Sequence, residues 1–77
     1  MMVYEAHGRT APHRALFRQM DWTWDAAEGC WWIEQEALDG IHDKRLTRIQ
    51  ALAQVRVQLV ARISPTLNDD ADPDLMI

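Results

Sequence analysis

The residues with the greatest capacity for chemistry in this sequence are a single cysteine, Cys30, and three histidines, His7, His13 and His42. Thiolates and imidazoles bind Zn²⁺ and haem iron, but the known sites space these ligands in short motifs such as Cys-x-x-Cys or His-x-x-x-His. The sequence contains neither spacing. We therefore predict no metal site and no cofactor.

Catalysis by Cys30 would require a general base beside the thiol, and no spacing in the sequence arranges one. Glycine-rich loops that bind phosphate are also absent from the sequence. The carboxylates between residues 21 and 39 fall among the surface positions of a predicted helix, as expected of its solvated face. We predict no catalytic residue and expect a protein that is not an enzyme.

Four tryptophans occur in 77 residues, and all of them lie between positions 22 and 32. Trp24 and Trp31 are seven residues apart, which places them on one face of a helix and predicts that both are core residues. Trp22 and Trp32 point elsewhere on such a helix. Because an exposed indole forfeits about 2–3 kcal/mol of burial and tryptophan is enriched in binding hot spots, we predict a partner-binding surface of Trp22, Trp32 and Ile33. The alternative is that these rings pack on neighbouring charged side chains.

The element expected to carry these residues is a long amphipathic helix over residues 10–38. Thr10 is a suitable N-cap, and Pro12 has a backbone angle suited to the first turn of a helix. Apolar side chains then recur at helical spacing, with charged side chains opposite them. Asp39-Gly40 is typical of a helix end, since glycine adopts the left-handed conformation without steric cost.

A second helix is expected over residues 43–63, with Asp43 as its N-cap and Ser64-Pro65 as its end. Two helices joined by a short turn predict an all-α fold, in which an antiparallel helical hairpin assembles into a dimeric four-helix bundle. The alternative is one continuous helix over residues 12–63 in a long coiled coil, because Gly40 costs only about 1 kcal/mol inside a helix.

The apolar arcs of the two helices are predicted to form the core of the oligomer. Its residues are Leu16, Phe17, Met20, Trp24, Trp31, Leu38, Leu46, Ile49, Leu52, Leu59, Val60 and Ile63.

A chain of 77 residues buries only roughly 60% of the surface that its unfolded form exposes and is marginally stable alone, so it needs a disulfide, a metal or a partner. One cysteine excludes an intramolecular disulfide, which leaves association. We predict a homodimer or a higher oligomer that also binds another protein. The domain organisation expected is an N-terminal arm over residues 1–9, a helical hairpin domain over residues 10–64 and an acidic disordered tail over residues 65–77.

The charge pattern raises an alternative function. The net charge is −4, and the four aspartates after residue 64 account for it. The second predicted helix is basic and begins with Lys44, Arg45 and Arg48, which is typical of nucleic-acid binding. The isoelectric point of about 5.1 and the lack of a third helix for a helix-turn-helix reader argue against it.

The acidic run over residues 69–74 is followed by three apolar residues, Leu75, Met76 and Ile77. It resembles the acidic tails of bacterial single-stranded DNA-binding proteins, although it lacks their final Pro-Phe. The resemblance covers about ten residues and implies that Leu75, Met76 and Ile77 bind a basic-rimmed pocket on a partner protein. The alternative is a tail that only increases solubility.

The longest uninterrupted apolar stretch is Cys30 to Ile33, far shorter than the roughly 20 residues that cross a bilayer. We expect a cytoplasmic protein that does not bind membranes. The function expected is that of a small non-enzymatic interaction module, acting as a regulator, adaptor or inhibitor through a Trp-rich helix. The alternatives are a nucleic-acid-associated regulator and an accessory subunit of a larger complex.

Overall fold

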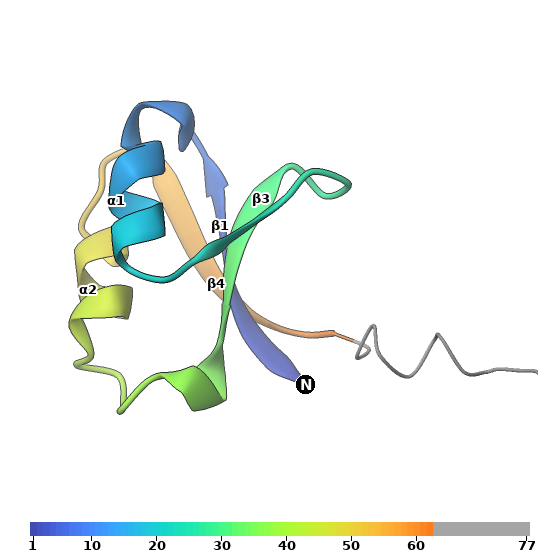
Figure 1. Cartoon of the computed structure of the whole chain (residues 1–77), viewed down its shortest axis with the longest axis vertical. Coiled ribbons are helices and arrows are strands. Elements are labelled where there is room, and N and C mark those ends of the chain that lie inside the picture. Colours follow the sequence, from blue (N-terminus) through green and yellow to red (C-terminus); the bar gives the residue numbers. More distant parts are fainter. Residues whose placement is uncertain (63–77) are drawn as a thin grey trace, which may run out of the picture.

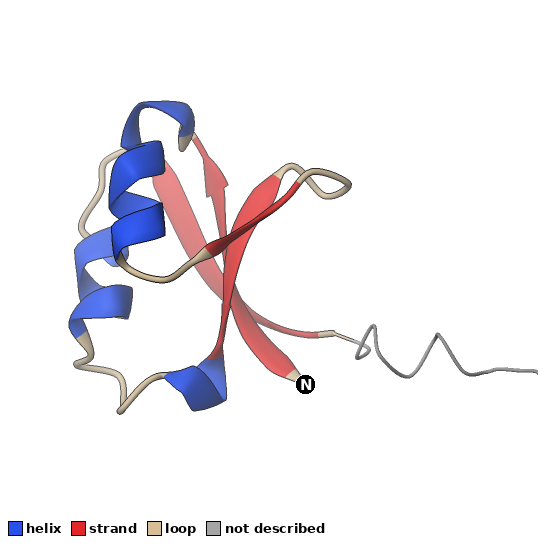
Figure 2. Ribbon diagram, in the orientation of Figure 1, coloured by secondary structure: helices blue, strands red, loops and turns tan. Residues whose placement is uncertain are grey.

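The computed structural model describes residues 1–62 and consists of a four-stranded antiparallel sheet with helices against one face (Figures 1 and 2). The strands are β1 (Met2–Gly8), β2 (Thr23–Asp25), β3 (Cys30–Glu34) and β4 (Val55–Ala61). The helical elements are the 3-10 helices η1 (Ala11–His13) and η2 (Gln35–Ala37) and the α-helices α1 (Arg14–Gln19) and α2 (Lys44–Gln50).

The strands lie in the order β2-β3-β1-β4, and each neighbouring pair is antiparallel. α1 lies between β1 and β2 in the chain and α2 between β3 and β4, so each connection passes over one intervening strand. This βαββαβ order is that of the ferredoxin-like, or split βαβ, motif. The sheet has two edges, the three-residue β2 and the seven-residue β4.

The predicted all-α fold is therefore wrong, both as a helical hairpin in a dimeric four-helix bundle and as a long coiled coil. The first predicted helix fails because Trp24 and Trp31 are not two turns apart on a helix. They are cross-strand neighbours in the β2–β3 hairpin. The turn between them is held by the Asp25 carboxylate, which accepts hydrogen bonds from the backbone N–H groups of Ala27 and Glu28. Gly29 completes the turn with a φ of +67°.

The second predicted helix is shorter than expected because residues 55–59 alternate apolar and polar side chains, a period of two that suits a strand. The helix ends at Gln50, and Gln54 has a φ of +64°, which no α-helix accommodates. The start of this helix is confirmed. The carboxylate of Asp43 accepts a hydrogen bond from the backbone N–H of Arg45, as an N-cap does.

Residues 1–9, predicted as an arm, contain β1, which lies between β3 and β4. Val3 and Ala6 on this strand are fully buried. Gly8 ends the strand with a φ of +102°, and a Cβ atom there would lie 2.4 Å from the carbonyl oxygen of Gln54. The first segment of the chain is therefore central to the sheet.

The main core lies between the sheet and the two helices. Phe17 of α1 stacks on Trp31 of β3, with ring centroids 4.9 Å apart, and meets Trp22 edge-on at 5.4 Å. The indole Nε1 of Trp22 donates a hydrogen bond of 2.7 Å to the carbonyl oxygen of Arg45, which satisfies its polar atom inside the core. Other buried members are Ala6, Ile33, Leu46 and Ile49. A single copy thus buries a core that was predicted to need a second one.

No helix within residues 1–62 has the length and apolar character needed to span a membrane.

Candidate functional site

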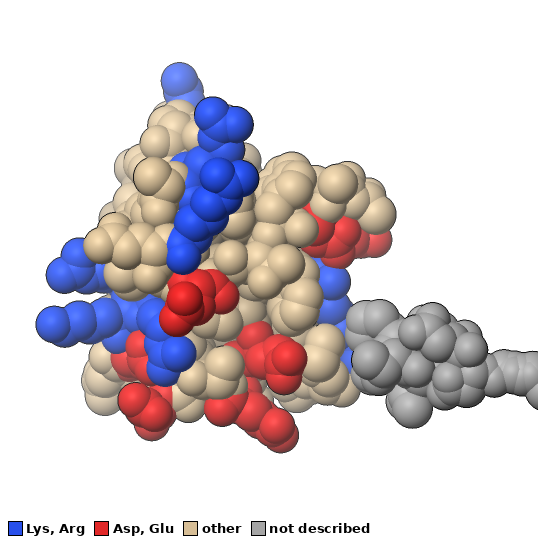
Figure 3. Space-filling view, viewed as in Figure 1, with Lys and Arg blue, Asp and Glu red and all other residues tan. Residues whose placement is uncertain are grey.

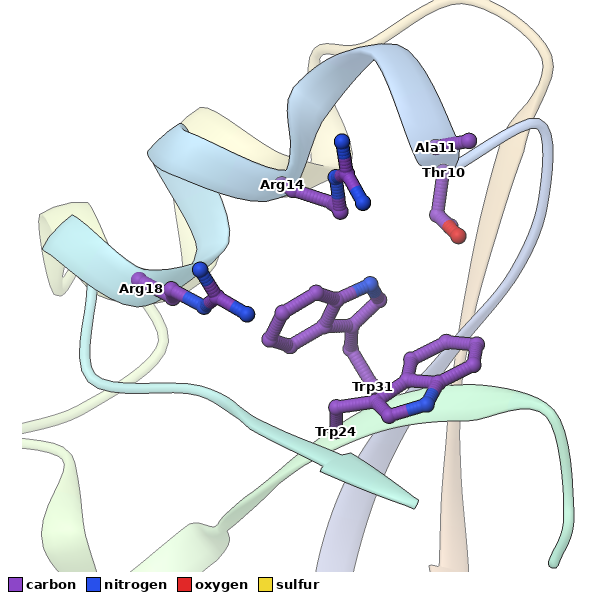
Figure 4. Close-up of a pocket in the computed structure, with 6 residues that line it drawn as sticks. All are labelled: Thr10, Ala11, Arg14, Arg18, Trp24 and Trp31. Atoms are coloured by element: carbon purple, nitrogen blue, oxygen red, sulfur yellow. The ribbon is translucent and has the colours of Figure 1, made fainter. Parts of the chain in front are cut away.

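A pocket of about 290 Å³ opens beside the β2 edge of the sheet, where α1 faces the β2–β3 hairpin (Figure 4). We call it the arginine–tryptophan pocket. It is lined by Thr10, Ala11, Arg14, Arg18, Trp24 and Trp31.

Local structure sets the position of each side chain in this pocket. Arg14 and Arg18 are four residues apart on α1, so their side chains project from the same face of the helix. Figure 4 shows the guanidinium of Arg14 above the indole of Trp31 and the guanidinium of Arg18 at the side of that ring, with Trp24 next to it. The two indoles lie 5.3 Å apart between centroids and are tilted by 57°. Trp31 is 3% exposed and forms the floor, whereas Trp24 is 46% exposed and forms an open wall.

The pocket is electropositive. Neither Arg14 nor Arg18 has a carboxylate oxygen within 4.0 Å among residues 1–62. Residues 9–20 contain three arginines and no acidic residue, which explains why no local partner is at hand. Figure 3 shows Lys and Arg side chains over the part of the surface that the helices form.

Thr10 adds a polar group to the pocket wall. It is the one buried polar residue within residues 1–62, at 7% exposure, and its side chain makes no capping hydrogen bond to η1. Figure 4 shows its hydroxyl at the pocket, on the same side as the tryptophans. A buried hydroxyl is normally hydrogen-bonded, so a ligand group or water that enters this pocket has a donor and acceptor available to it.

A third arginine, Arg62, lies over a tryptophan on the opposite face of the sheet. The guanidinium of Arg62 is 5.4 Å from the ring centroid of Trp32. Its nitrogens lie 2.8 Å from a carboxylate oxygen of Glu5 and 2.9 Å from one of Asp25. We call these residues, together with His7 and Cys30, the Arg62 cluster.

Hydrogen bonds and burial shift the pKa values of the two carboxyl groups and of the thiol in the Arg62 cluster. Burial opposes the ionisation of Glu5, but hydrogen bonds from His7 and Arg62 outweigh it and hold the pKa of Glu5 below its ordinary value. The backbone N–H of Glu28, followed by Arg62, lowers the pKa of Asp25. Burial, with the nearby Glu5 charge, raises the pKa of the Cys30 thiol. Cys30 is therefore kept as a thiol and is poorly suited to nucleophilic catalysis.

The Arg62 cluster also contains three side chains of the kinds that bind metals. One ligand atom each from Glu5, His7 and Cys30 lies within 4.8 Å of the others. Sequence spacing does not reveal this grouping, because the pairing of β3 with β1 brings Cys30 beside Glu5 and His7. The Arg62 guanidinium contacts both the Glu5 carboxylate and, at 3.7 Å, the Cys30 sulfur. The positively charged Arg62 guanidinium thus already lies against these donor atoms, and we assign no metal to them.

The residues predicted to bind a partner lie elsewhere than expected. Trp22 and Ile33 are buried in the core at 4% exposure each, and Trp32 is half-buried beneath Arg62. Leu75, Met76 and Ile77 lie outside the described residues. The exposed tryptophan is Trp24, which the sequence analysis placed in the core.

The residues predicted as the oligomer core divide into three groups. Those buried within one copy are Phe17, Trp31, Leu46 and Ile49. Those half-buried are Leu16, Met20, Leu38, Leu52 and Val60. Trp24 and Leu59 are exposed, the latter by 43%, and Ile63 lies outside the described residues.

The predicted nucleic-acid-binding residues are all on α2, but they are not equivalent. Lys44 and Arg48 are exposed. Arg45 folds back on the N-cap, where its guanidinium lies 2.6 Å from Asp43 and 4.0 Å from Asp21. Its charge is therefore largely compensated within the chain.

Comparison with protein-family models, with curated proteins and with solved structures finds no match to this chain.

Proposed function

We propose that this chain is a small non-enzymatic binding module, and that its arginine–tryptophan pocket holds an acidic segment of a partner protein. The observation that carries the proposal is the pair of uncompensated arginines, Arg14 and Arg18, in one pocket with a tryptophan wall that the fold leaves open. A role as regulator, adaptor or inhibitor would follow from such binding.

The chemistry of the pocket defines the ligand. Guanidinium groups bind carboxylates through paired, charge-assisted hydrogen bonds. The indoles of Trp24 and Trp31 offer an apolar surface between α1 and the hairpin. A pocket of about 290 Å³ admits one large side chain. The best fit is thus a peptide with one apolar or aromatic side chain flanked by carboxylates, and arginine with tryptophan is the usual composition of an interface hot spot.

Nucleic acid fits the same surface less well. A polyanion needs a basic track that follows several phosphates. Residues 1–62 contain eight basic and eight acidic side chains, and the rest of the chain adds four aspartates. A body without net charge favours local recognition of a few carboxylates over capture of a long polyanion.

The experiment is a titration of the full ¹⁵N-labelled chain with the peptide acetyl-DDFDD-amide, followed by NMR. We expect shifts of the Trp24 indole N–H and of the Arg14 and Arg18 side-chain N–H groups. The neutral peptide acetyl-NNFNN-amide is the ligand control. The double variant Arg14→Gln, Arg18→Gln should weaken binding at least about tenfold, because it removes charge-assisted hydrogen bonds. The matched control is Arg48→Gln, which removes an exposed arginine on α2.

Two outcomes would contradict the proposal. Equal binding of the acidic and neutral peptides would show that the arginines do not select carboxylates. Shifts produced by the oligonucleotide dT10 at the same residues, with none from the acidic peptide, would assign the pocket to nucleic acid instead.

A further inference from the structure

The outer edge of β4 is the longest stretch of unpaired strand within residues 1–62. β4 pairs with β1 on one side only, and it ends the strand order β2-β3-β1-β4. It has seven residues, whereas the opposite edge, β2, has three. Figures 1 and 2 show that β4 and β2 lie at opposite sides of the sheet.

The hydrogen bonds to β1 identify which backbone groups of β4 point outward. Met1 and Arg62 exchange both of their backbone hydrogen bonds, and the N–H of Arg9 donates to the carbonyl oxygen of Gln54. Hydrogen-bonded pairs alternate along an antiparallel ladder, so the even-numbered residues 54 to 62 bond to β1. The N–H and C=O groups of Val55, Val57, Leu59 and Ala61 therefore point away from the sheet, eight groups in all.

This edge lacks the usual protection against pairing. Natural edge strands carry prolines, lysines, bulges or inward-pointing charges that discourage a further strand. Between residues 55 and 61 there is no proline or lysine, the register with β1 is continuous over all seven residues, and Arg56 is the one charged residue. Leu59 is 43% exposed on the face that the helices cover.

We propose that β4 is the interface of a homodimer, in which the β4 strands of two copies pair antiparallel to form one eight-stranded sheet. The register is centred on Gln58. Residues opposite each other in a sheet must point to the same face, which restricts a twofold pairing to registers centred on a residue. Centring on Gln58 aligns Val57 with Leu59 and Val55 with Ala61, and it pairs all eight outward groups.

The alternative registers are worse. Centring on Val57 or on Leu59 leaves two of the eight outward groups of residues 55–61 without a partner in the other β4. Centring on Arg56 places two like charges directly opposite each other, which is destabilising. In the Gln58 register, Arg56 faces Val60 and each exposed Leu59 packs beside the Val57 of the other copy. The β4 strand is thus complementary to a second β4 strand. For this reason the partner that we propose for this edge is another copy of the same chain.

The dimer is independent of the proposed function. The arginine–tryptophan pocket lies at the β2 edge, so pairing through β4 leaves both pockets open at the two ends of the joined sheet. A twofold contact of this kind closes on itself and stops at two copies.

Disulfide trapping tests both the interface and its register. Gln58→Cys places two thiols across the twofold axis, where a non-hydrogen-bonded pair has Cα atoms about 4.5 Å apart, within the range of a disulfide. We expect this variant to form a covalent dimer on mild oxidation. Arg56→Cys is the matched control on the same face of the same strand, and its two copies would be about 13 Å apart along the strands. The native chain controls for Cys30, which is fully buried.

Sedimentation of the native chain and of Leu59→Pro provides the second arm. Proline removes an N–H that points outward and is not used inside one copy, and edge strands tolerate it. We expect a native dimer and a folded Leu59→Pro monomer, with folding checked by the near-ultraviolet signal of the buried tryptophans. Leu59→Ala keeps the N–H and should remain largely dimeric.

A native chain that sediments as a monomer at 100 µM would overturn the proposal. So would a dimer that survives Leu59→Pro, or a covalent yield for Arg56→Cys equal to that for Gln58→Cys.

Discussion

The two faces of the sheet each place arginine beside tryptophan, but with opposite electrostatic outcomes. On the face without helices, Arg62 lies over Trp32 and contacts the carboxylates of Glu5 and Asp25. On the helix side, Arg14 and Arg18 line a pocket with Trp31 and have no carboxylate partner within residues 1–62. Arginine and tryptophan therefore have a structural role on the face without helices, whereas on the helix side they are available to a ligand.

The difference shows that composition does not identify a binding arginine. An arginine between two carboxylates already has the anions that a ligand would supply, and displacing them would leave partly buried charges unpaired. An arginine without an anion, held by a helix at the wall of an open pocket, gains hydrogen bonds when a ligand carboxylate arrives. The two sites differ in whether the arginine already has a carboxylate partner. They do not differ in whether an arginine is present.

The largest expected effect comes from the two tryptophans that line the pocket. Trp31→Ala removes a buried ring that stacks on Phe17, and it should lower the free energy of unfolding by about 3–5 kcal/mol. Trp24→Ala removes a ring that is 46% exposed, and it should cost about 1 kcal/mol or less while it weakens binding of the acidic peptide. Urea unfolding and peptide titration measure both effects. Equal losses of stability for the two variants would show that Trp31 is not the structural floor of the pocket and Trp24 its exposed wall.

A smaller effect should separate the arginines of the two faces. Arg62→Ala leaves Glu5 without its guanidinium partner in a partly exposed setting, so we expect a loss of about 1–2 kcal/mol of unfolding free energy. The matched variant Arg14→Ala should change stability by no more than about 0.5 kcal/mol, since no ion pair is broken. Thermal unfolding of the two variants in parallel tests the comparison. It would fail if Arg14→Ala were the more destabilising of the two.

The smallest effect is the pH dependence of the Arg62 cluster. Burial opposes ionisation of Glu5, but hydrogen bonds from His7 and Arg62 keep its pKa in the folded chain below the ordinary value. Ionised Glu5 therefore stabilises the fold above its ordinary pKa, and this contribution is lost as the pH falls through the lowered value. Between about pH 5 and pH 3, the free energy of unfolding should fall more steeply for the native chain than for Glu5→Gln.

The double variant Arg14→Gln, Arg18→Gln is the control for this pH dependence. It should follow the native pH curve, because neither arginine contacts a titrating carboxylate within residues 1–62. If the unfolding free energy of the native chain depended on pH in the same way as that of Glu5→Gln, Glu5 would not contribute to stability in acid.

Parts of the fold were predictable from local signals. Asp43 caps α2 as predicted, and helical structure begins near Pro12. The hairpin was also visible in principle, since residues 30–33 are rich in the aromatic and β-branched types that favour strands. The prediction failed because positions seven apart satisfy two patterns. Trp24 and Trp31 can share a helix face, or they can face each other across a hairpin whose turn is centred between them.

The candidate site was predictable only in part. The concentration of tryptophan at residues 22–32 correctly marked the region, but the exposed member is Trp24 and not Trp22 or Trp32. The absence of acidic residues over 9–20 was a usable signal for uncompensated arginines. Assignment of inward and outward side chains required the strand register, because a change from helix to strand reassigns every side chain to a different face.

The sequence by itself determined where the chain turns and which residues carry charge. Short-range chemistry is enough for this, because a cap such as Asp43 or a turn such as that at Asp25 is made within a few residues. Only the tertiary structure decided which charges are compensated. Arg62 meets carboxylates that lie 57 and 37 residues earlier in the chain, and no local pattern encodes such a contact. Arg14 and Arg18 have no such partner among the described residues because the strands that carry Glu5 and Asp25 direct these side chains to the other face of the sheet.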